Sequence, residues 1–367
     1  MKKIKPMYKF LLLFLMPLTI LQAQTFTEQE RHVRTYPVSP NSNIEVNNKY
    51  GKIYVKTWQK DSVKFEIDLN ISSNSLTRLH KVKNSISFDF TTSRYYITAI
   101  TNFGSAGNQI YTELKNLSDA LIPGKNTIEI NYTVYCPESV NLSLINKFGD
   151  IYIDDLRGEI NVSLSNGDLK VNSISGISRI ELNFGNGMIN HLTDANLSVS
   201  YSDMKIKSAE KLSINSKSST LHIDDADLLK LDSRRDKYFI TRVYSIHTVA
   251  NFSQLWMEEV NYDSHMNLKF GSLTIDKVRA GFSGIDIVSE YADLNLHFDA
   301  DASFKADIFY HKDVVFEPPK ARLITEPENE KISDTEIHTR FRTASSGELS
   351  DVKINALQKC YLNMIIN

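Results

Sequence analysis

Residues 146–171 read NKFGDIYIDDLRGEINVSLSNGDLKV, and this stretch contains two copies of one short unit. The first copy, FGDIYI at residues 148–153, is followed 18 residues later by NGDLKV at residues 166–171. After its Gly-Asp pair, each copy places one apolar residue, one polar or aromatic residue and a second apolar residue. This alternation predicts a short β-strand with one buried face. The stretch therefore predicts a repeat architecture.

The same unit continues downstream as far as Leu296. With Ile151 as the first anchor position, later copies follow at steps of 17 or 18 residues, apart from a last step of 21. The position two residues after the anchor is apolar in every copy. The positions five after and seven before it are each apolar with a single exception. The anchors are Ile151, Leu169, Gly187, Met204, Leu221, Tyr238, Leu255, Leu273 and Leu294.

These columns predict how the copies pack. Each copy holds two short strands joined by turns rich in Gly, Ser, Asn and Asp. A unit this small cannot bury its apolar side alone, but stacked copies can. Strands that recur once per turn pair in parallel, at about 4.8 Å per turn. The sequence therefore predicts an all-β fold, a single-stranded parallel β-helix or β-solenoid with about 17–18 residues per turn.

The regular repeat occupies residues 141–300, and the segments on either side differ from it. Residues 24–140 carry matching columns near Ile53 and longer alternating segments, which predict a β-rich section that starts the solenoid and covers its open edge. Within it, residues 109–121 favour a short helix. Residues 301–367 are expected to form a C-terminal rung or cap, with a long polar loop at residues 311–342.

A second signature, an aromatic residue followed by a small one, stands just before many of the anchors. We expect the small residue, usually glycine, to adopt a positive φ at a tight corner. The aromatic rings should then stack along that corner, either as a structural ladder or as a stacking surface for a ligand. The pairs are Tyr50-Gly51, Phe148-Gly149, Phe184-Gly185, Tyr201-Ser202, Phe252-Ser253, Phe270-Gly271 and Tyr291-Ala292.

The amino-terminal residues predict export. Residues 1–23 combine a lysine-rich start, an apolar run at residues 10–21 and a small residue, Ala23. This pattern is typical of a cleaved signal peptide, and the apolar run is short for a membrane span. We therefore expect a mature chain without a transmembrane segment, in the periplasm, on the outer-membrane surface or outside the cell.

Composition excludes several classes of function. The 367-residue chain has 42 Lys and Arg against 44 Asp and Glu, a formal net charge of −2. Such a balance gives no drive toward nucleic acid or anionic membranes. The nine His residues show no metal-ligand spacing, and no catalytic triad or phosphate-binding loop is recognisable. We therefore expect no cofactor, no metal and no catalytic residue.

The two cysteines, Cys136 and Cys360, leave two possibilities open. An oxidising compartment would allow a disulfide between them. If they lie at opposite ends of a rod, however, they cannot meet.

Three motifs carry a resemblance to a known family. A GxIxV opening occurs in NNKYGKIYVKTW at residues 47–58, YTVYCP follows at residues 132–137, and LxLxxxxGDIxIxxLxG spans residues 142–158. In this order they resemble the secreted bacterial "putative adhesin" family, whose domain is a β-helix of GxIxV repeats. The resemblance covers nearly all of the mature chain and implies a parallel β-helical fold, an envelope location and no known enzymatic activity. The segment 311–342 departs from the family pattern.

One outward column of the repeat offers a candidate binding surface. The residue between the two apolar strand positions faces outward, and Phe239 and Trp256 occupy this column in successive copies. If the register holds, their rings lie about 5 Å apart and can stack on a sugar ring or an aromatic partner. Alternatively, residues 301–342 fold back over the column, or it only stabilises the surface. The candidate ligand-binding residues are Phe239, Trp256, His222, Lys205 and Tyr152.

Acidic residues gather at Asp154 and Asp155 and again at Asp224, Asp225 and Asp227. On glycan-cleaving β-helices, acids of adjacent turns act as a paired acid and base or as Ca²⁺ ligands. Here they fall in turns, at offsets that do not repeat, which favours solvated turns. The segment DSRRD at residues 232–236 likewise predicts a turn that pairs its own charges.

Together these observations predict a non-enzymatic cell-envelope β-solenoid that binds or scaffolds an envelope protein or a glycan. Two alternatives stay open. One is a polysaccharide lyase or glycoside hydrolase on the same fold, and the other is a regulatory partner of an envelope-stress sensor.

Overall fold

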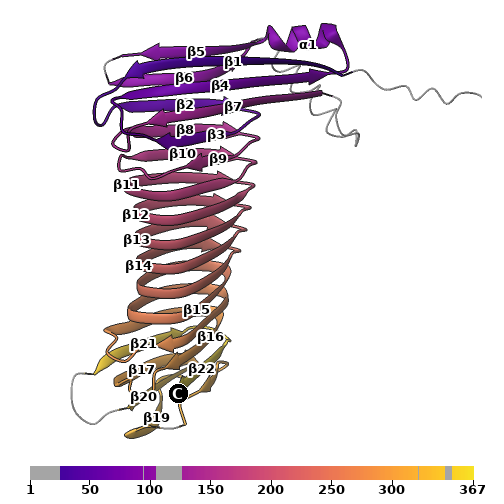
Figure 1. Ribbon diagram of the computed structural model, residues 1–367. Helices are drawn as coiled ribbons and strands as arrows, with labels where there is room; N and C mark the ends of the chain where they lie inside the picture. The colour runs from indigo at the N-terminus through magenta and orange to yellow at the C-terminus, as the bar shows by residue number, and fades with distance from the viewer. Residues whose placement is uncertain (1–24, 94, 105–125, 321, 344–348) are drawn as a thin grey trace, which may run out of the picture.

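The computed structural model describes residues 25–93, 95–104, 126–320, 322–343 and 349–367. The predicted signal peptide at residues 1–23 and the predicted helix at residues 109–121 lie outside these ranges. Within them, the chain forms 22 strands and one eight-residue helix. All strands belong to a single sheet whose pairings are mostly parallel, and they are stacked along an elongated body (Figure 1). The prediction of an all-β fold is confirmed.

In the middle of the chain, each strand pairs in parallel with the strand one repeat later. Leu169 lies opposite Gly187, Gly187 opposite Met204, and Met204 opposite Leu221, as the repeat columns predict. Each such passage of 17 or 18 residues is a rung of the stack. The strands of this section are β8 (Asn141–Lys147), β9 (Ile151–Ile153), β10 (Ile160–Ser165), β11 (Leu169–Asn183), β12 (Asn186–Ser200), β13 (Asp203–Lys217), β14 (Thr220–Arg234), β15 (Lys237–Val278) and β16 (Gly284–Phe298).

The apolar columns form the core between the strands. Ile151, Leu169, Leu221 and Leu273 are fully buried. Burial of such a side chain contributes roughly 1.5–3 kcal/mol, and the register repeats this contribution on each rung. Gly187 lacks a side chain at its anchor position, and Met204 of the next rung occupies the adjoining space.

The corners differ from the prediction. The residue with positive φ is the aromatic one, with φ of 58° at Phe148 and 57° at Phe184, and among the small residues only Gly271 of the pair Phe270-Gly271 also has a positive φ, of 127°. Most of the small residues are glycines, which are required because the main chains of neighbouring rungs approach each other closely there. A Cβ at Gly149 would lie 1.9 Å from the carbonyl oxygen of Gly51, one rung away. The sequence shows the aromatic–small pair, but it does not show which member makes the turn.

Near the amino terminus, one rung of the stack is built from residues that lie far from the rest of the repeat in sequence. Ile44 in β2 lies opposite Leu142 in β8, and Ile53 in β3 lies opposite Ile151 in β9. On the other side, β2 and β3 pair in parallel with β6 and β7. The antiparallel strands β1, β4 and β5 then cover this end (Figure 1). The elements are β1 (Phe26–Pro37), β2 (Asn43–Lys49), β3 (Ile53–Thr57), β4 (Ser62–Ser73), α1 (Leu76–Lys83), β5 (Ile86–Thr92), β6 (Tyr96–Phe103) and β7 (Asn126–Cys136).

At the other end, the last two strands of the chain insert between earlier ones. Strand β21 (Ser350–Ala356) pairs in parallel with β16 on one side and with β17 (Phe304–His311) on the other. Strand β22 (Tyr361–Ile366) likewise lies between β16 and β18 (Val315–Glu317). The carboxyl-terminal strands therefore form an internal rung, and the stack continues beyond them.

The prediction of a long polar loop at residues 311–342 is wrong. This segment contains β18 and a hairpin of β19 (Thr325–Lys331) and β20 (Glu336–Arg342), and β20 pairs antiparallel with β17. One face of β20 is buried through Thr339 and Phe341, and His338 is buried on the other face. Its apolar residues, Ile337 and Phe341, are few and stand between charged ones. The apolar–polar alternation is therefore too weak to predict a strand.

The two cysteines are free and lie at opposite ends of the body, Cys136 in β7 and Cys360 just before β22 (Figure 1). Burial raises the pKa of the Cys136 thiol to about 12 and that of the Cys360 thiol to about 11. Both thiols therefore stay protonated near neutral pH, and they act as small core residues.

Candidate functional site

The outward column that the sequence singled out is continuous in the structure. Successive members lie opposite one another in the parallel register, because every rung repeats the same strand position. The column extends one rung further toward the amino terminus than predicted, since Tyr54 stacks on Tyr152 with ring centroids 4.9 Å apart. Its members are Tyr54, Tyr152, Lys170, Met188, Lys205, His222, Phe239, Trp256, Thr274 and Asn295.

Three of the five predicted residues form one aromatic group. The His222 ring stacks on Phe239 with centroids 4.8 Å apart and planes 13° apart. Trp256 meets Phe239 edge to face at 6.2 Å, and not in the 5 Å arrangement that was expected. The Trp256 side chain stays 37% exposed. We name His222, Phe239 and Trp256 the aromatic column.

The other two predicted residues are engaged elsewhere. Lys205 adjoins His222 in the column, but its ammonium group lies 3.5 Å from the Asp224 carboxylate. Tyr152 lies on the far side of Lys170 and Met188 and donates a hydrogen bond to Asp150 at 3.1 Å. Tyr152 is therefore not part of the aromatic column.

The alternative in which residues 301–342 cover this column is wrong. Strands β17 to β20 continue the stack beyond β21 and β22, at the end of the body (Figure 1). The aromatic column therefore lies on an open surface.

The corner aromatics form a second exposed surface. Phe184, Tyr201 and Phe252 are each about half exposed, so these rings lie outside the corner. Tyr50 stacks on Phe148 at 5.6 Å, and Phe184 stacks on Tyr201 at 5.1 Å. The predicted ladder is thus present but interrupted by Asn166, Ser218 and Arg235. Its longest run is Phe252, Phe270 and Tyr291, with centroid spacings of 4.6 and 5.1 Å.

A third pair, Tyr244 and Tyr262, stacks at 4.9 Å with nearly parallel planes, and both side chains are more than 40% exposed. No pattern in the sequence analysis pointed to it. The three groups together place exposed aromatic rings on the rungs between residues 222 and 291. This part of the stack therefore carries three separate groups of aromatic rings.

The acidic clusters do not converge on a common point. Asp224 pairs with Lys205, Asp225 pairs with Arg242 on the next rung, and Asp155 accepts a hydrogen bond from Asn172 at 2.6 Å. These carboxylates link neighbouring rungs. They do not present the pair of facing acids that glycoside cleavage needs.

The prediction of a self-paired turn at residues 232–236 is wrong. The Asp236 carboxylate is buried, with only 2% of the residue exposed. Its oxygens accept hydrogen bonds from the hydroxyl groups of Ser216 and Ser233, both at 2.7 Å, and from the amides of Ser219 and Arg234, both at 2.8 Å. The partners of the Asp236 carboxylate are hydroxyl and amide groups of its own rung and of the preceding rung. A pattern of neighbouring charges in the sequence does not predict such partners.

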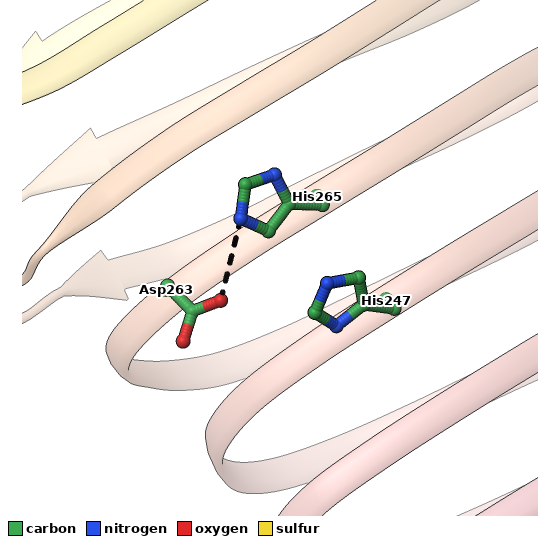
Figure 2. A group of neighbouring side chains, drawn as sticks. All are labelled: His247, Asp263 and His265. Carbon is green, nitrogen blue, oxygen red and sulfur yellow. Dashed lines mark ion pairs between the residues drawn. The ribbon is translucent and has the colours of Figure 1, made fainter.

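Two histidines and an aspartate meet where the sequence analysis expected no metal ligands. The rings of His247 and His265 stack with centroids 4.8 Å apart, and His265 Nε2 lies 3.5 Å from Asp263 Oδ2 (Figure 2). The two histidines border an open depression of about 380 Å³ that Lys230 and Asp286 also line. The signal was present in the sequence, because His247 and His265 are 18 residues apart, which is one rung. Local metal-ligand spacings do not reveal this pair, because its two members are separated by the repeat length.

No family model matches this chain, and no curated protein matches it. Among solved structures, a putative adhesin from Parabacteroides distasonis is similar, with a TM-score of 0.40 and 10% identity over 72% of this chain and 97% of that chain. A putative adhesin from Parabacteroides merdae has a TM-score of 0.29 and 7% identity over 72% of this chain and 95% of that chain. A putative lipid binding protein from Parabacteroides distasonis has a TM-score of 0.27 and 9% identity over 91% and 96%. At these TM-scores the likeness carries no argument about ligand or activity.

Among the residues that the structure describes, no helix is long enough and apolar enough to cross a membrane.

Proposed function

We propose that this chain is an exported, non-enzymatic β-solenoid that binds a glycan through the aromatic column. The single observation that carries the proposal is the contiguous group of His222, Phe239 and Trp256 on an open face of the sheet, with His222 stacked on Phe239 and Trp256 edge to face with it. Consecutive strands pair in parallel at steps of 17 and 18 residues, and this pairing supports a solenoid, in which each turn of the chain stacks on the one before it.

The column has the properties of a sugar-binding surface. Aromatic rings offer flat apolar faces, and sugars stack on them through their C–H groups, with Trp supplying the largest face. Polar side chains at both ends, Lys205 and Thr274, can form hydrogen bonds to sugar hydroxyls. The parallel ladders hold these groups in a fixed spacing, so little conformational entropy is lost on binding.

The arrangement of acids supports a binding role over a cleaving one. A lyase or hydrolase needs carboxylates that face one another across a substrate. Asp224 and Asp225 instead pair with cations of neighbouring rungs. Turnover of a glycan that is abolished by Asp224→Asn or Asp225→Asn would contradict the non-enzymatic part of the proposal.

The test is binding of the mature chain (residues 24–367) to an array of glycans and envelope fractions, with a Phe239→Ala/Trp256→Ala double variant alongside. Each stacked ring contributes about 0.5–1.5 kcal/mol, so loss of both should weaken binding by about tenfold or more. The matched control is Phe184→Ala/Tyr201→Ala, which removes a stacked pair from the corner outside the aromatic column. This control should bind as the unchanged chain does, and circular dichroism should show the same β-sheet content in all three.

Equal glycan binding by the unchanged chain and the Phe239→Ala/Trp256→Ala variant would show that the aromatic column is not the binding site. Binding to an envelope fraction but to no glycan would replace the glycan by a protein partner. Export is tested separately by cell fractionation, where we expect a processed chain that lacks residues 1–23. An unprocessed chain in the cytoplasm would contradict it.

A further inference from the structure

The repeat brings His247, Asp263 and His265 together from two neighbouring passages of β15. His247 and His265 occupy the same position on successive rungs, which explains why their rings stack at 4.8 Å. Asp263 precedes His265 by two residues, so both side chains project from the same face of the strand. Figure 2 shows Asp263 and His265 on one passage and His247 on the adjacent passage.

Their spacing suits coordination of one ion. The candidate ligand atoms of all three residues lie within 4.8 Å of one another. Two ligands that bind a tetrahedral Zn²⁺ at about 2.0–2.2 Å are roughly 3.4 Å apart. His265 Nε2 and Asp263 Oδ2 already stand 3.5 Å apart. Only the exposed His247 ring has to turn from its stacked position to complete the set.

The surroundings orient the carboxylate and leave room beside it. The Ser245 hydroxyl donates a hydrogen bond to the other oxygen of Asp263, as a second-shell partner does in metal sites. On the next rung the position opposite Asp263 is Gly284, so no side chain occupies that space.

The charges in the neighbouring columns are mixed. Lys230 lies opposite His247 on one side, and Asp286 lies opposite His265 on the other. With Asp263, two carboxylates face one ammonium group, which leaves the group a net negative charge when both imidazoles are neutral.

We propose that His247, Asp263 and His265 bind a divalent transition-metal ion, for which Zn²⁺ is the probe. Two imidazole nitrogens and one carboxylate oxygen match the ligands that Zn²⁺ prefers, whereas Ca²⁺ and Mg²⁺ prefer oxygen ligands throughout. Three protein ligands leave at least one position to water. The site is open to solvent and independent of the proposed glycan surface.

The experiment is calorimetric titration of the tag-free mature chain (residues 24–367) with ZnCl₂ at pH 7.5. We expect one Zn²⁺ per chain and no heat with CaCl₂. His247→Gln, Asp263→Asn and His265→Gln should each weaken Zn²⁺ binding by at least about tenfold, since each removes a direct ligand. The control, His222→Gln, removes an exposed histidine of the aromatic column and should leave the affinity unchanged. Binding should also weaken at pH 5.5, because protons compete for the imidazole nitrogens.

A second readout identifies the ligands. The electron paramagnetic resonance spectrum of bound Cu²⁺ should show coupling to two imidazole nitrogens in the unchanged chain and to one in His247→Gln. Absence of Zn²⁺ binding, or binding that all three variants retain, would overturn the proposal. The Phe239→Ala/Trp256→Ala variant should bind Zn²⁺ normally, which separates this site from the glycan surface.

Discussion

The rungs before and after residue 200 close the same corner with different chemistry. In the earlier part, the corner position is glycine, at Gly149, Gly167 and Gly185, and we name it the glycine corner. The backbones approach so closely that a Cβ at Gly167 would lie 2.2 Å from the Gly149 carbonyl oxygen. The residue after the glycine then completes the corner, because the Asp168 amide donates a hydrogen bond to the Asp150 carboxylate at 3.0 Å.

From residue 202 to residue 253, the corner position carries a side-chain oxygen, at Ser202, Ser219, Asp236 and Ser253, and we name it the hydroxyl corner. The position is glycine again at Gly271 and alanine at Ala292. The Ser219 amide donates to Asp236 Oδ1 at 2.8 Å, and the Asp236 amide donates to the Ser253 hydroxyl at 3.1 Å. The amide of the following residue, such as Lys237, donates to the main-chain oxygen of the previous corner residue.

The difference teaches that the repeated requirement is an acceptor for each corner amide, and not a particular residue type. In the glycine corner, the outward Asp150 carboxylate accepts from the amide that follows the glycine, and the backbones lie close together. The hydroxyl corner meets it with a buried oxygen. The Gly-Asp motif alone therefore loses the repeat after Gly167-Asp168, although the parallel pairing continues.

The largest effect is expected from Gly167→Ala in the glycine corner. The added methyl group has to push against the main chain of Gly149, which cannot move without breaking the parallel pairing. We expect a loss of at least about 3 kcal/mol in the free energy of unfolding. Urea denaturation followed by circular dichroism measures it.

The matched control is Gly284→Ala, where the added Cβ would lie 3.4 Å from the nearest atom, the Asp351 carbonyl oxygen. Equal losses in the two variants would mean that close approach is not what the glycine corner requires.

A smaller effect is expected from Asp236→Ala in the hydroxyl corner. The change removes the acceptor of the Ser219 and Arg234 amides and of two hydroxyl groups, all in a buried site. We expect a loss of about 2 kcal/mol, because buried donors then lack partners. The control is Asp236→Ser, which installs the residue that Ser202, Ser219 and Ser253 place in the same column. It should recover part of the loss in the same urea experiment. If Asp236→Ser is no more stable than Asp236→Ala, the corner position does not stabilise the fold through its side-chain oxygen.

The smallest effect concerns pH and returns to the glycine corner. Burial opposes ionisation of Asp150, but the Asp168 amide, the Lys52 ammonium and the Tyr152 hydroxyl together hold the pKa of its carboxyl below the usual range. A lowered folded-state pKa stabilises the fold above the unfolded value of about 3.9, and this contribution is lost as the pH falls through the folded-state pKa. Asp150→Asn should therefore be less stable than the unchanged chain at pH 7, and the difference should shrink below pH 4.

Thermal unfolding across this pH range measures the effect. Lys52→Met is the companion variant, since it removes the ammonium group and leaves the Asp168 amide in place. It should retain part of the pH dependence. A difference between Asp150→Asn and the unchanged chain that stays constant with pH would show that the Asp150 charge does not contribute.

Much of the fold could be predicted because a repeat turns sequence spacing into contact. Once Ile151 and Leu169 are placed one rung apart, the partners of the remaining strand residues follow, because a parallel register continues along the whole strand. The same arithmetic placed Phe239 beside His222 and Trp256. Applied to the histidines, it would also have placed His247 beside His265.

The ends of the stack could not be predicted in the same way. Strands β21 and β22 insert between β16 and the earlier β17 and β18, and β2 and β3 pair with β8 and β9 across nearly a hundred residues. Alternation in these segments reveals strands but not their neighbours.

The sequence by itself thus determined the strand type, the rung length and the inward and outward columns, because these depend on local alternation and a constant period. Only the tertiary structure decided which corner residue takes positive φ, where the Asp236 carboxylate is buried, and that Asp263 joins two histidines. These outcomes depend on distances between separate passages of the chain, and a periodic pattern does not contain those distances.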